Sequence, residues 1–498
     1  MTGDRRIREI VVAGNGLVGL SAAALLKRRI PGTTVTVVGA PPPPEAVIER
    51  TASTLPSITG FHHDLGIGEA DVLRSGASFR LGTLFDGWAR GAPYVHAYGE
   101  VGRRFGTTSF HLHWARLARA GKVPPFDSHS PAAMLARGGR FVHPQGGEDS
   151  PLGSFEYGLN IDPPRYREMM RAFARHVGVI ERDRAIAEVR LDAQTGFIEA
   201  LRFEDGSEIG GHLFVDCTGP AALVRSKLDD RFEDWGRWLP CDRILFAGGP
   251  GTPEPAPLDK AVAHAAGWRW ESACRAASSH GLVYASAHLS DSKAERVLRG
   301  ASALEPGAPV ALRQGRRSQP WLRNCVAIGD SAVSIEPLEW AGLHLAHSAL
   351  DRLVAKMPDR DFSSVELWDY NRECAAEADR VRDFLALHYI ASDRPKDEFW
   401  RAAAAAEPPA SLAHTLALFR ERGRLPLYEE ETFNRHSWVS VLLGQGVLPH
   451  RDDPLVDAIP ADQTSQAMAQ MRENLAALAS SLPTNGAYLR QLASGAQR

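Results

Sequence analysis

Three glycines near the start of the chain, Gly14, Gly16 and Gly19, have the spacing of a phosphate-binding turn. In the stretch GNGLVG they allow a tight turn and let the backbone approach a pyrophosphate closely. A helix follows the glycines, and the free N–H groups at a helix N-terminus favour the negative charge of a phosphate. The spacing is weak support by itself, so the neighbouring elements decide its meaning.

The segments on either side of the glycines supply the required context. Residues 8–14 (REIVVAG) predict a short buried strand, residues 20–29 (LSAAALLKRR) a helix, and residues 34–39 (TVTVVG) a second strand. A strand, a glycine turn, a helix and a second strand form the unit that binds dinucleotides. This order favours nucleotide binding over a simple strand–helix turn.

The second strand lacks the acidic residue that usually binds the ribose hydroxyls at this point. Gly39 and Ala40 occupy the place, and four prolines then force an extended loop. Glu45 and Glu49 are two carboxylates that could substitute, and spacing does not choose between them.

A second polar position follows a buried strand much later in the chain. Residues 321–331 (WLRNCVAIGDS) predict a strand that ends at Gly329 and Asp330, before a helix over residues 344–356. In open α/β sheets, ligands bind outside the carboxyl ends of the strands. We therefore expect Asp330 to lie near the ribose or the ribityl chain of a bound cofactor.

The bulk composition is that of an ordinary globular protein. The 498 residues are 44% hydrophobic and 23% charged, and the formal net charge is −3. This balance gives no field that attracts nucleic acid or an anionic membrane, so neither is a predicted partner. No apolar run reaches the roughly 18 residues of a membrane-spanning helix, and the N-terminus lacks the apolar core of a signal peptide. The predicted location is the cytoplasm.

Cysteines and histidines give little support for a disulfide or a metal site. The five cysteines are far apart and form no C-x-x-C pair, as expected of reduced, buried thiols. His111 and His113 form an H-x-H in a strand-like segment, where alternation would turn both side chains to one face. No further ligand stands at a supporting spacing, and the same holds for His62, His63 and Asp64. No metal site is predicted.

Eight motifs, in the right order and over nearly the whole chain, resemble those of the flavin-dependent tryptophan halogenases. They are GNGLVG, TASTLP, LGIGEADVLRSGASFRLGTLFDGW, HLFVDCTGP, GWRW, GDSAVSIEPLEWAGLHLAHSAL, VRDFLALHYIASDRPKDEFW and SWVSVLLGQGVLP. The resemblance implies an α/β fold with a Rossmann-type, flavin monooxygenase-like FAD domain. Residues 1–365 would form that domain with interleaved substrate-facing segments, and residues 366–498 a mainly helical substrate-side region.

The resemblance also implies the reaction and the partners. Reduced FAD and O2 oxidise chloride or bromide to hypohalous acid, which travels through a tunnel to an electron-rich aromatic ring such as indole. A separate flavin reductase supplies the reduced cofactor, and the absence of a second G-x-G-x-x-G agrees with that. The family allows a homodimer.

Two residues match the family's reacting positions. Glu339, in PLEWAG, corresponds to the glutamate that accepts the ring proton or orients the hypohalous acid. Arg80 stands where the family has a lysine that relays the halogen. A guanidinium keeps its proton, so it has no lone pair with which to form a chloramine, but it can still donate hydrogen bonds. No lysine lies between Lys27 and Lys122 to replace it.

The remaining carried-over positions follow the motifs. The resemblance implies cofactor binding by Gly14, Gly16, Leu17, Gly19, Thr54, Gly329, Asp330 and Gly342. His96, Tyr98 and Trp340 are the predicted substrate-binding residues. His96 and Tyr98 match a pair that sandwiches the substrate ring, and Trp340, beside Glu339, stands where the family has a small hydroxyl residue. Trp268 and Trp270 match the WxW motif that separates flavin from substrate.

Two alternatives stay open at this point. The arginine and the altered strap, with Thr51 and Ala52 where the family has Gly-Glu, also fit a diverged flavin hydroxylase or a peroxide-forming flavoprotein. A flavin-binding protein without enzymatic activity is the third hypothesis.

Overall fold

The computed structural model describes residues 5–39, 41–121, 123–147, 150–394 and 396–495, so Ala40 and Lys122 lie outside the described residues. The chain divides into two compact units, each built from three stretches. Unit 1 comprises residues 1–75, 161–236 and 310–379, and unit 2 comprises residues 76–160, 237–309 and 380–498. Both units interleave distant segments, and the predicted boundary at residues 365 and 366 stays a prediction.

Unit 1 contains the predicted strand–turn–helix–strand. Strand β1 (Glu9–Ala13) leads into helix α1 (Leu17–Arg29), which returns to strand β2 (Thr34–Val38). β1 pairs in parallel with β2 on one side and with β11 (Leu213–Asp216) on the other. A short parallel unit of this kind places the glycine turn at the carboxyl edge of the sheet.

The complete sheet has the order β19-β20-β11-β1-β2-β7. Its remaining strands are β20 (Cys325–Ala327) and the two edge strands, β7 (Ile180–Arg182) and β19 (Trp321–Leu322). The single strand predicted over residues 321–331 is wrong: the chain turns at Arg323, whose φ is +52°, and β19 pairs antiparallel with β20. Only β20 reaches the parallel sheet and carries the chain to Asp330.

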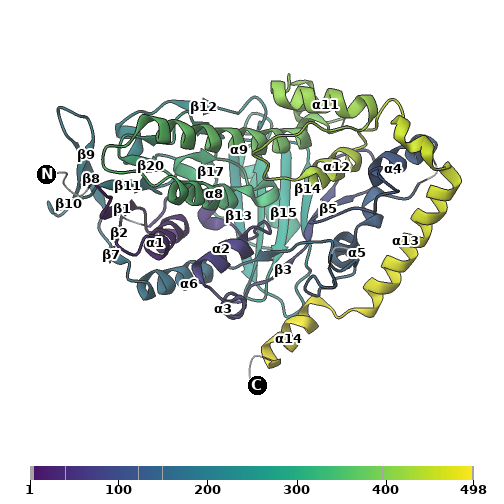
Figure 1. Ribbon diagram of the computed structural model, residues 1–498, viewed down its shortest axis with the longest axis horizontal. Helices are drawn as coiled ribbons and strands as arrows, with labels where there is room; N and C mark the ends of the chain where they lie inside the picture. The colour runs from purple at the N-terminus through teal and green to yellow at the C-terminus, as the bar shows by residue number, and fades with distance from the viewer. Residues whose placement is uncertain (1–4, 40, 122, 148–149, 395, 496–498) are drawn as a thin grey trace. The chain divides into compact units, whose positions relative to one another are not determined.

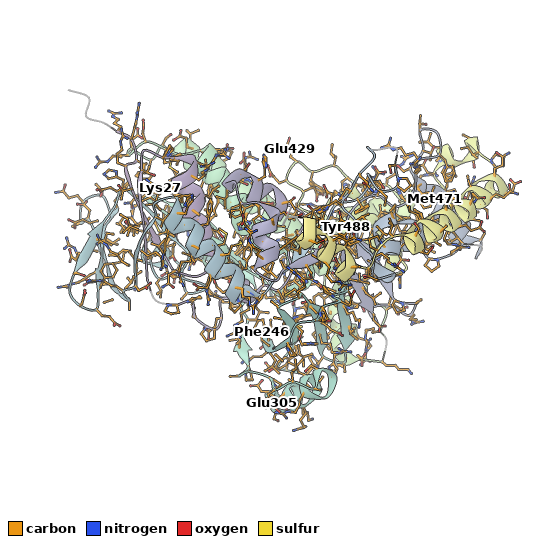
Figure 2. The ribbon with its side chains drawn as sticks, turned by 90° about the horizontal axis from the view of Figure 1, so that it is seen from below. Lys27, Phe246, Glu305, Glu429, Met471 and Tyr488 are labelled. Carbon is orange, nitrogen blue, oxygen red and sulfur yellow. The ribbon has the colours of Figure 1, made fainter. Side chains whose placement is uncertain are left out.

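Helix α1 is buried over most of its length because its residues are apolar or small. Leu17 to Leu26 are all buried, and Lys27, Arg28 and Arg29 face the negative end of the dipole in the last turn. Lys27, labelled in Figure 2, donates to the carbonyl of Thr33 over 2.6 Å. Helix α6 (Pro163–His176) lies beside α1 in Figure 1.

Further elements of unit 1 complete it. Strands β8 (Ile186–Leu191), β9 (Ile198–Phe203) and β10 (Glu208–Gly210) form a small antiparallel sheet, and the hairpin of β9 and β10 turns at Asp205 and Gly206. The other elements are η1 (Val47–Arg50), α2 (Ile58–Leu65), α3 (Glu69–Arg74), η3 (Arg225–Lys227), β12 (Phe232–Asp234), β18 (Gly315–Arg317), η4 (Gly329–Ser331), β21 (Val333–Ser334), η5 (Leu338–Trp340) and α8 (Ala341–Ala355).

Unit 2 is organised on an antiparallel-rich sheet. Its strands run in the order β13-β16-β15-β14-β4-β5, with β4 (Gly82–Asp86) parallel to β14 (Asp259–His264). The others are β5 (Tyr94–Ala97), β13 (Arg243–Pro250), β15 (Gly267–Ala273) and β16 (Ala277–Tyr284). Helix α7 (Asp291–Ser302) packs on β13 and β16, in the region that Figure 2 marks with Phe246 and Glu305.

The helices of unit 2 come mainly from the end of the chain. They are α4 (Phe110–Arg119), η2 (Phe126–His129), α5 (Pro131–Arg137), α10 (Glu398–Ala405), α11 (Ala410–Arg422), α12 (Arg435–Gly444), η6 (Pro454–Ala458), α13 (Ala461–Ser481) and α14 (Asn485–Gly495). A small pair, β3 (Ser78–Arg80) and β6 (Gly158–Asn160), carries Arg80. Helix α9 (Ser364–Ile390) and strand β17 (Val310–Ala311) complete the secondary structure of the described chain. Among the described helices, none combines the length and apolar character needed to cross a membrane.

The strand-like interpretation of the H-x-H segment is wrong. His111 and His113 lie in helix α4, where Phe110, Trp114 and Leu117 form a buried face with helical spacing. Residues two apart on a helix point in different directions, so the two histidines do not share a face.

Candidate functional site

The glycine turn of unit 1 has the geometry that a nucleotide cradle requires. Gly14 has φ +109°, and a Cβ there would collide with the carbonyl oxygen of Cys217. A Cβ on Gly19 would collide with the carbonyl oxygen of Gly14, so the first turn of α1 packs directly on the loop. Gly16 is the N-cap residue of α1 and supplies no side chain to the free N–H groups.

Those N–H groups are instead bound by a carboxylate from another element. Glu49, in η1, accepts from the backbone N–H of Leu17 over 2.5 Å and of Val18 over 3.1 Å. Burial raises the pKa of Glu49, against the lowering effect of these two hydrogen bonds. Glu49 was one of two candidates for the ribose partner, and in this structure it caps the helix.

A different carboxylate lies at the carboxyl end of β2. The side-chain amide of Asn15 donates to the carbonyl of Gly39 over 3.2 Å and to Asp183 Oδ1 over 3.0 Å. Asp183 follows β7, the strand beside β2, and is exposed. No sequence pattern connects Asp183 with this edge, because the contact depends on the strand order.

Asp330 lies at the other side of the turn, in η4. Its Oδ2 accepts from the N–H of Ile48 over 3.0 Å, whereas its Oδ1 is buried and has no hydrogen-bond partner among the described residues. Burial raises the pKa of Asp330 to about 8, and the charge of Glu49 adds to this. Gly329 has φ +66°, and a Cβ on it would lie 2.9 Å from Val18, so glycine allows η4 to approach α1.

Glu339 and Trp340 have an unusual backbone. Both residues have φ +60°, in the left-handed region, and both side chains are buried. Two consecutive non-glycine residues in this region store strain, and such strain persists mainly at functional sites. Gly342 follows in α8, and a Cβ there would lie 2.9 Å from Ile48. Thr54 is buried in the stretch after η1.

In unit 2, Arg80 is completely buried and held by an acidic partner. Its Nε lies 2.6 Å from Asp259 Oδ2, and its Nη2 donates to Thr83 Oγ over 2.6 Å. Both Arg80 and Asp259 have 1% or less of their side chains exposed. A buried cation needs such a partner, because an unpaired one would carry the full cost of desolvation. The partner comes from β14 and was not found from the sequence.

The structure brings Tyr98 to Arg80. The guanidinium carbon lies 5.1 Å from the centroid of the Tyr98 ring, a cation–π distance. The Tyr98 hydroxyl is buried and has no hydrogen-bond partner within the described part of the chain. A buried hydroxyl of this kind is a suitable contact for a polar group on a ligand.

His96 and Tyr98 are neighbours, but not in a sandwich. Their ring centroids lie 6.0 Å apart and their planes meet at 79°. Holding a third ring between them requires nearly parallel planes about 7–8 Å apart, which is two van der Waals separations. His96 also contacts Phe384 and Phe433, which stack with centroids 4.0 Å apart.

Trp268 and Trp270 lie in the aromatic core of unit 2. Their centroids are 6.0 Å apart, Trp88 lies 6.1 Å from Trp268, and Trp270 donates to Ser279 over 3.1 Å. Alternation along β15 turns both indoles to the same face. Core packing accounts for these contacts, and a separating role for the pair stays a prediction.

His62 of α2 and His347 of α8 have structural partners. His62 Nε2 lies 2.6 Å from the Tyr166 hydroxyl, and burial lowers the pKa of His62 to about 4. His347 stacks on Phe61 with centroids 3.5 Å apart. No group of three His, Cys, Asp or Glu side chains in the described ranges is arranged for a metal ion.

The residues around the glycine turn fit an FAD. The glycines admit a pyrophosphate, and α1 presents its N-terminus. The Oδ1 of Asp330, which has no partner among the described residues, suits a cofactor hydroxyl. Glu49 is the exception, because it already occupies the N–H groups that a pyrophosphate would use. Glu339 lies in unit 1 and Arg80 in unit 2, so their joint action on one substrate stays a prediction.

Comparisons with known proteins point in one direction. Residues 9–461 match the profile of a family described as tryptophan halogenase. A flavin-dependent halogenase from Brevundimonas sp. BAL3 is 36% identical in sequence, with a TM-score of 0.92 and coverage of 98% of this chain and 100% of that one.

Two further relatives agree. A flavin-dependent halogenase from Xanthomonas campestris is 32% identical, with a TM-score of 0.89 and coverage of 98% of both chains. A tryptophan 7-halogenase from Kutzneria sp. (strain 744) is 28% identical over 539 residues, covering 99% of each protein.

Proposed function

The chain belongs to the tryptophan halogenase family, and we propose that it halogenates an electron-rich aromatic ring of the indole type, with Arg80 and Glu339 as its catalytic residues. Its cofactor is FAD, which with O2 supplies the oxidising equivalents that convert chloride or bromide to hypohalous acid. The observation that carries the residue assignment is the buried guanidinium of Arg80, paired with Asp259 and set against Tyr98.

Arg80 acts as a hydrogen-bond donor in this proposal. A donor to the oxygen of hypohalous acid stabilises the charge that develops on that oxygen as the halogen passes to the ring carbon. The ring proton leaves to the Glu339 carboxylate, and the products are the halogenated ring and water. The pair with Asp259 holds the guanidinium in one orientation, so the direction of its N–H groups is fixed. The pair does not give the guanidinium a nucleophilic lone pair.

The activity test supplies FAD, a flavin reductase, bromide and indole-type compounds, and analyses the products by mass spectrometry. We expect a bromine isotope pattern from the unmodified protein. Glu339→Gln should lower kcat roughly 10²–10⁴-fold, the range for losing a general base. Glu188→Gln, an exposed change on β8, is the matched control.

Arg80 needs two substitutions. Arg80→Met should abolish the donor and reduce kcat by about 10²–10³-fold, whereas Arg80→Lys keeps a charged donor and should retain activity. An inert parent with an active Arg80→Lys variant would show that the arginine blocks halogenation. A product that gains one oxygen and no bromine would identify a hydroxylase.

Three features of the wider setting belong to the same proposal. We place the enzyme in the cytoplasm, supplied by a separate reductase, and assign it a homodimeric state. Cell fractionation tests the first, dependence of turnover on added reductase the second, and light scattering the third.

A further inference from the structure

We propose that Glu49 is a displaceable internal anion that competes with the pyrophosphate of FAD for the N-terminus of helix α1. This inference rests on the proposed use of FAD. It concerns how tightly this chain binds the cofactor, and it assigns that control to a residue of η1, in the segment between β2 and α2.

The first support is the geometry of the carboxylate. Glu49 spans two successive N–H groups, with Oε2 on Leu17 and Oε1 on Val18. These are the first residues of a helix whose N-cap is a glycine without a side chain. A phosphate bound at the same turn would need the same donors, because the first N–H groups of a helix have no partner within it.

The second support is steric. A Cβ built on Gly16 would collide with the carboxylate of Glu49, so this group lies directly against the glycine turn. The backbone can therefore approach either Glu49 or a pyrophosphate at this point. Both cannot be accommodated in the same space, and two anions there would also repel each other.

The third support is the charge of the surroundings. The charge of Arg167, on α6, acts on Glu49, and Arg171 donates to the carbonyl of Asn15 over 3.3 Å. Figure 1 shows α6 alongside α1. Two arginines and a helix N-terminus thus lie near the carboxylate that occupies these N–H groups. The buried Oδ1 of Asp330, for which the described part of the chain supplies no partner, marks a place for a ligand hydroxyl on the same η1–η4 side.

The interactions that stabilise the Glu49 carboxylate are ones that a ligand can replace. Two hydrogen bonds to backbone N–H groups and the helix dipole stabilise it. A pyrophosphate brings more charge and more acceptor oxygens to the same donors. FAD would bind only to the fraction of the protein in which Glu49 has left the turn. The apparent affinity for FAD is therefore lower than the intrinsic affinity of the open turn, in proportion to that fraction.

The test measures binding rather than turnover. FAD and ADP are titrated into the full-length apo protein by isothermal calorimetry, because ADP carries the pyrophosphate without the flavin. Glu49→Ala and Glu49→Gln should each lower the Kd of both ligands roughly tenfold or more, which is the size of one lost charge-assisted hydrogen bond. Glu188→Ala should leave both Kd values unchanged.

Hydrogen exchange gives a second readout that needs no ligand. The amides of Leu17 and Val18 should be protected in the apo protein, should exchange faster in Glu49→Ala, and should regain protection when ADP is added. Equal Kd values in all variants would overturn the inference and leave the halogenase proposal intact. Weaker binding by the Glu49 variants would also overturn it, by showing that the carboxylate supports the cofactor. Absence of FAD binding in every variant would overturn both proposals.

Discussion

The two units contain two buried or partly buried charges that are stabilised in different ways. In unit 2, Arg80 faces the opposite charge of Asp259 over 2.6 Å, with both side chains essentially inaccessible to solvent. In unit 1, Glu49 faces the N–H groups of Leu17 and Val18. The first arrangement is an ion pair and the second is a helix cap.

The difference indicates which site is rigid and which can exchange its ligand. Breaking a buried ion pair leaves an uncompensated charge and costs several kcal/mol. A helix cap is worth about 0.5–2 kcal/mol and can be replaced by any other anion. A fixed guanidinium suits a catalytic donor, whereas an exchangeable carboxylate suits the entry of a cofactor.

The largest effect is expected from breaking the ion pair. Asp259→Ala should lower the free energy of unfolding by about 3–5 kcal/mol, because Arg80 stays buried without its counter-charge. Urea unfolding followed by tryptophan fluorescence measures this. The double variant Arg80→Met with Asp259→Leu should recover most of the loss, and failure to recover would show that packing, not charge, dominates there.

Acid should reveal a second ion-paired carboxylate, in unit 1. Glu377 accepts from Ser348 over 2.8 Å and contacts His344 and Arg352. Burial raises the pKa of Glu377, but these hydrogen bonds and charges outweigh it and lower the pKa from 4.5 to about 2. The stabilisation, roughly 3 kcal/mol, is therefore complete above pH 4.5 and is lost as the pH falls toward 2.

The measurement is the free energy of unfolding between pH 6 and pH 2 for the parent and for Glu377→Gln. The parent should lose more stability than the variant across this window, since the glutamine cannot be protonated. Parallel curves would contradict the assignment.

A smaller effect is expected from removing the helix cap. Glu49→Ala should destabilise the apo protein by about 0.5–2 kcal/mol, the usual value of an N-cap. Thermal unfolding without ligand measures the loss, with Glu188→Ala as the control. A loss as large as that of Asp259→Ala would remove the distinction between the two charges.

The smallest effect on stability is expected at Tyr98. Tyr98→Phe removes a buried hydroxyl that has no partner among the described residues but keeps the ring under Arg80. Unfolding should change by no more than about 0.5 kcal/mol, whereas KM for the aromatic substrate should rise if the hydroxyl binds it. An unchanged KM would limit Tyr98 to a packing role.

Much of the fold could be predicted from local patterns. The glycine spacing and the apolar residues around it correctly predict β1, α1 and β2, and the Asp205–Gly206 turn follows from turn chemistry. The two-residue period of the H-x-H misled the prediction for α4, because the longer period of Phe110, Trp114 and Leu117 describes the segment better.

The candidate site was less accessible from the sequence. The positions of Arg80 and Glu339 could be assigned by motif, but the positive φ of Glu339 and Trp340 has no local signal, since neither is a glycine. Asp183 reaches the end of β2 only because β7 pairs with β2.

The amino-acid sequence alone determined the nucleotide-binding unit and the family, because both depend on residue types at short, ordered spacings. Tertiary structure decided what each charge faces. Asp259 is 179 residues from Arg80 and Glu49 is 32 residues from Leu17 along the chain. A charge must be neutralised within a few ångströms in space, and only the folded chain brings such distant residues that close.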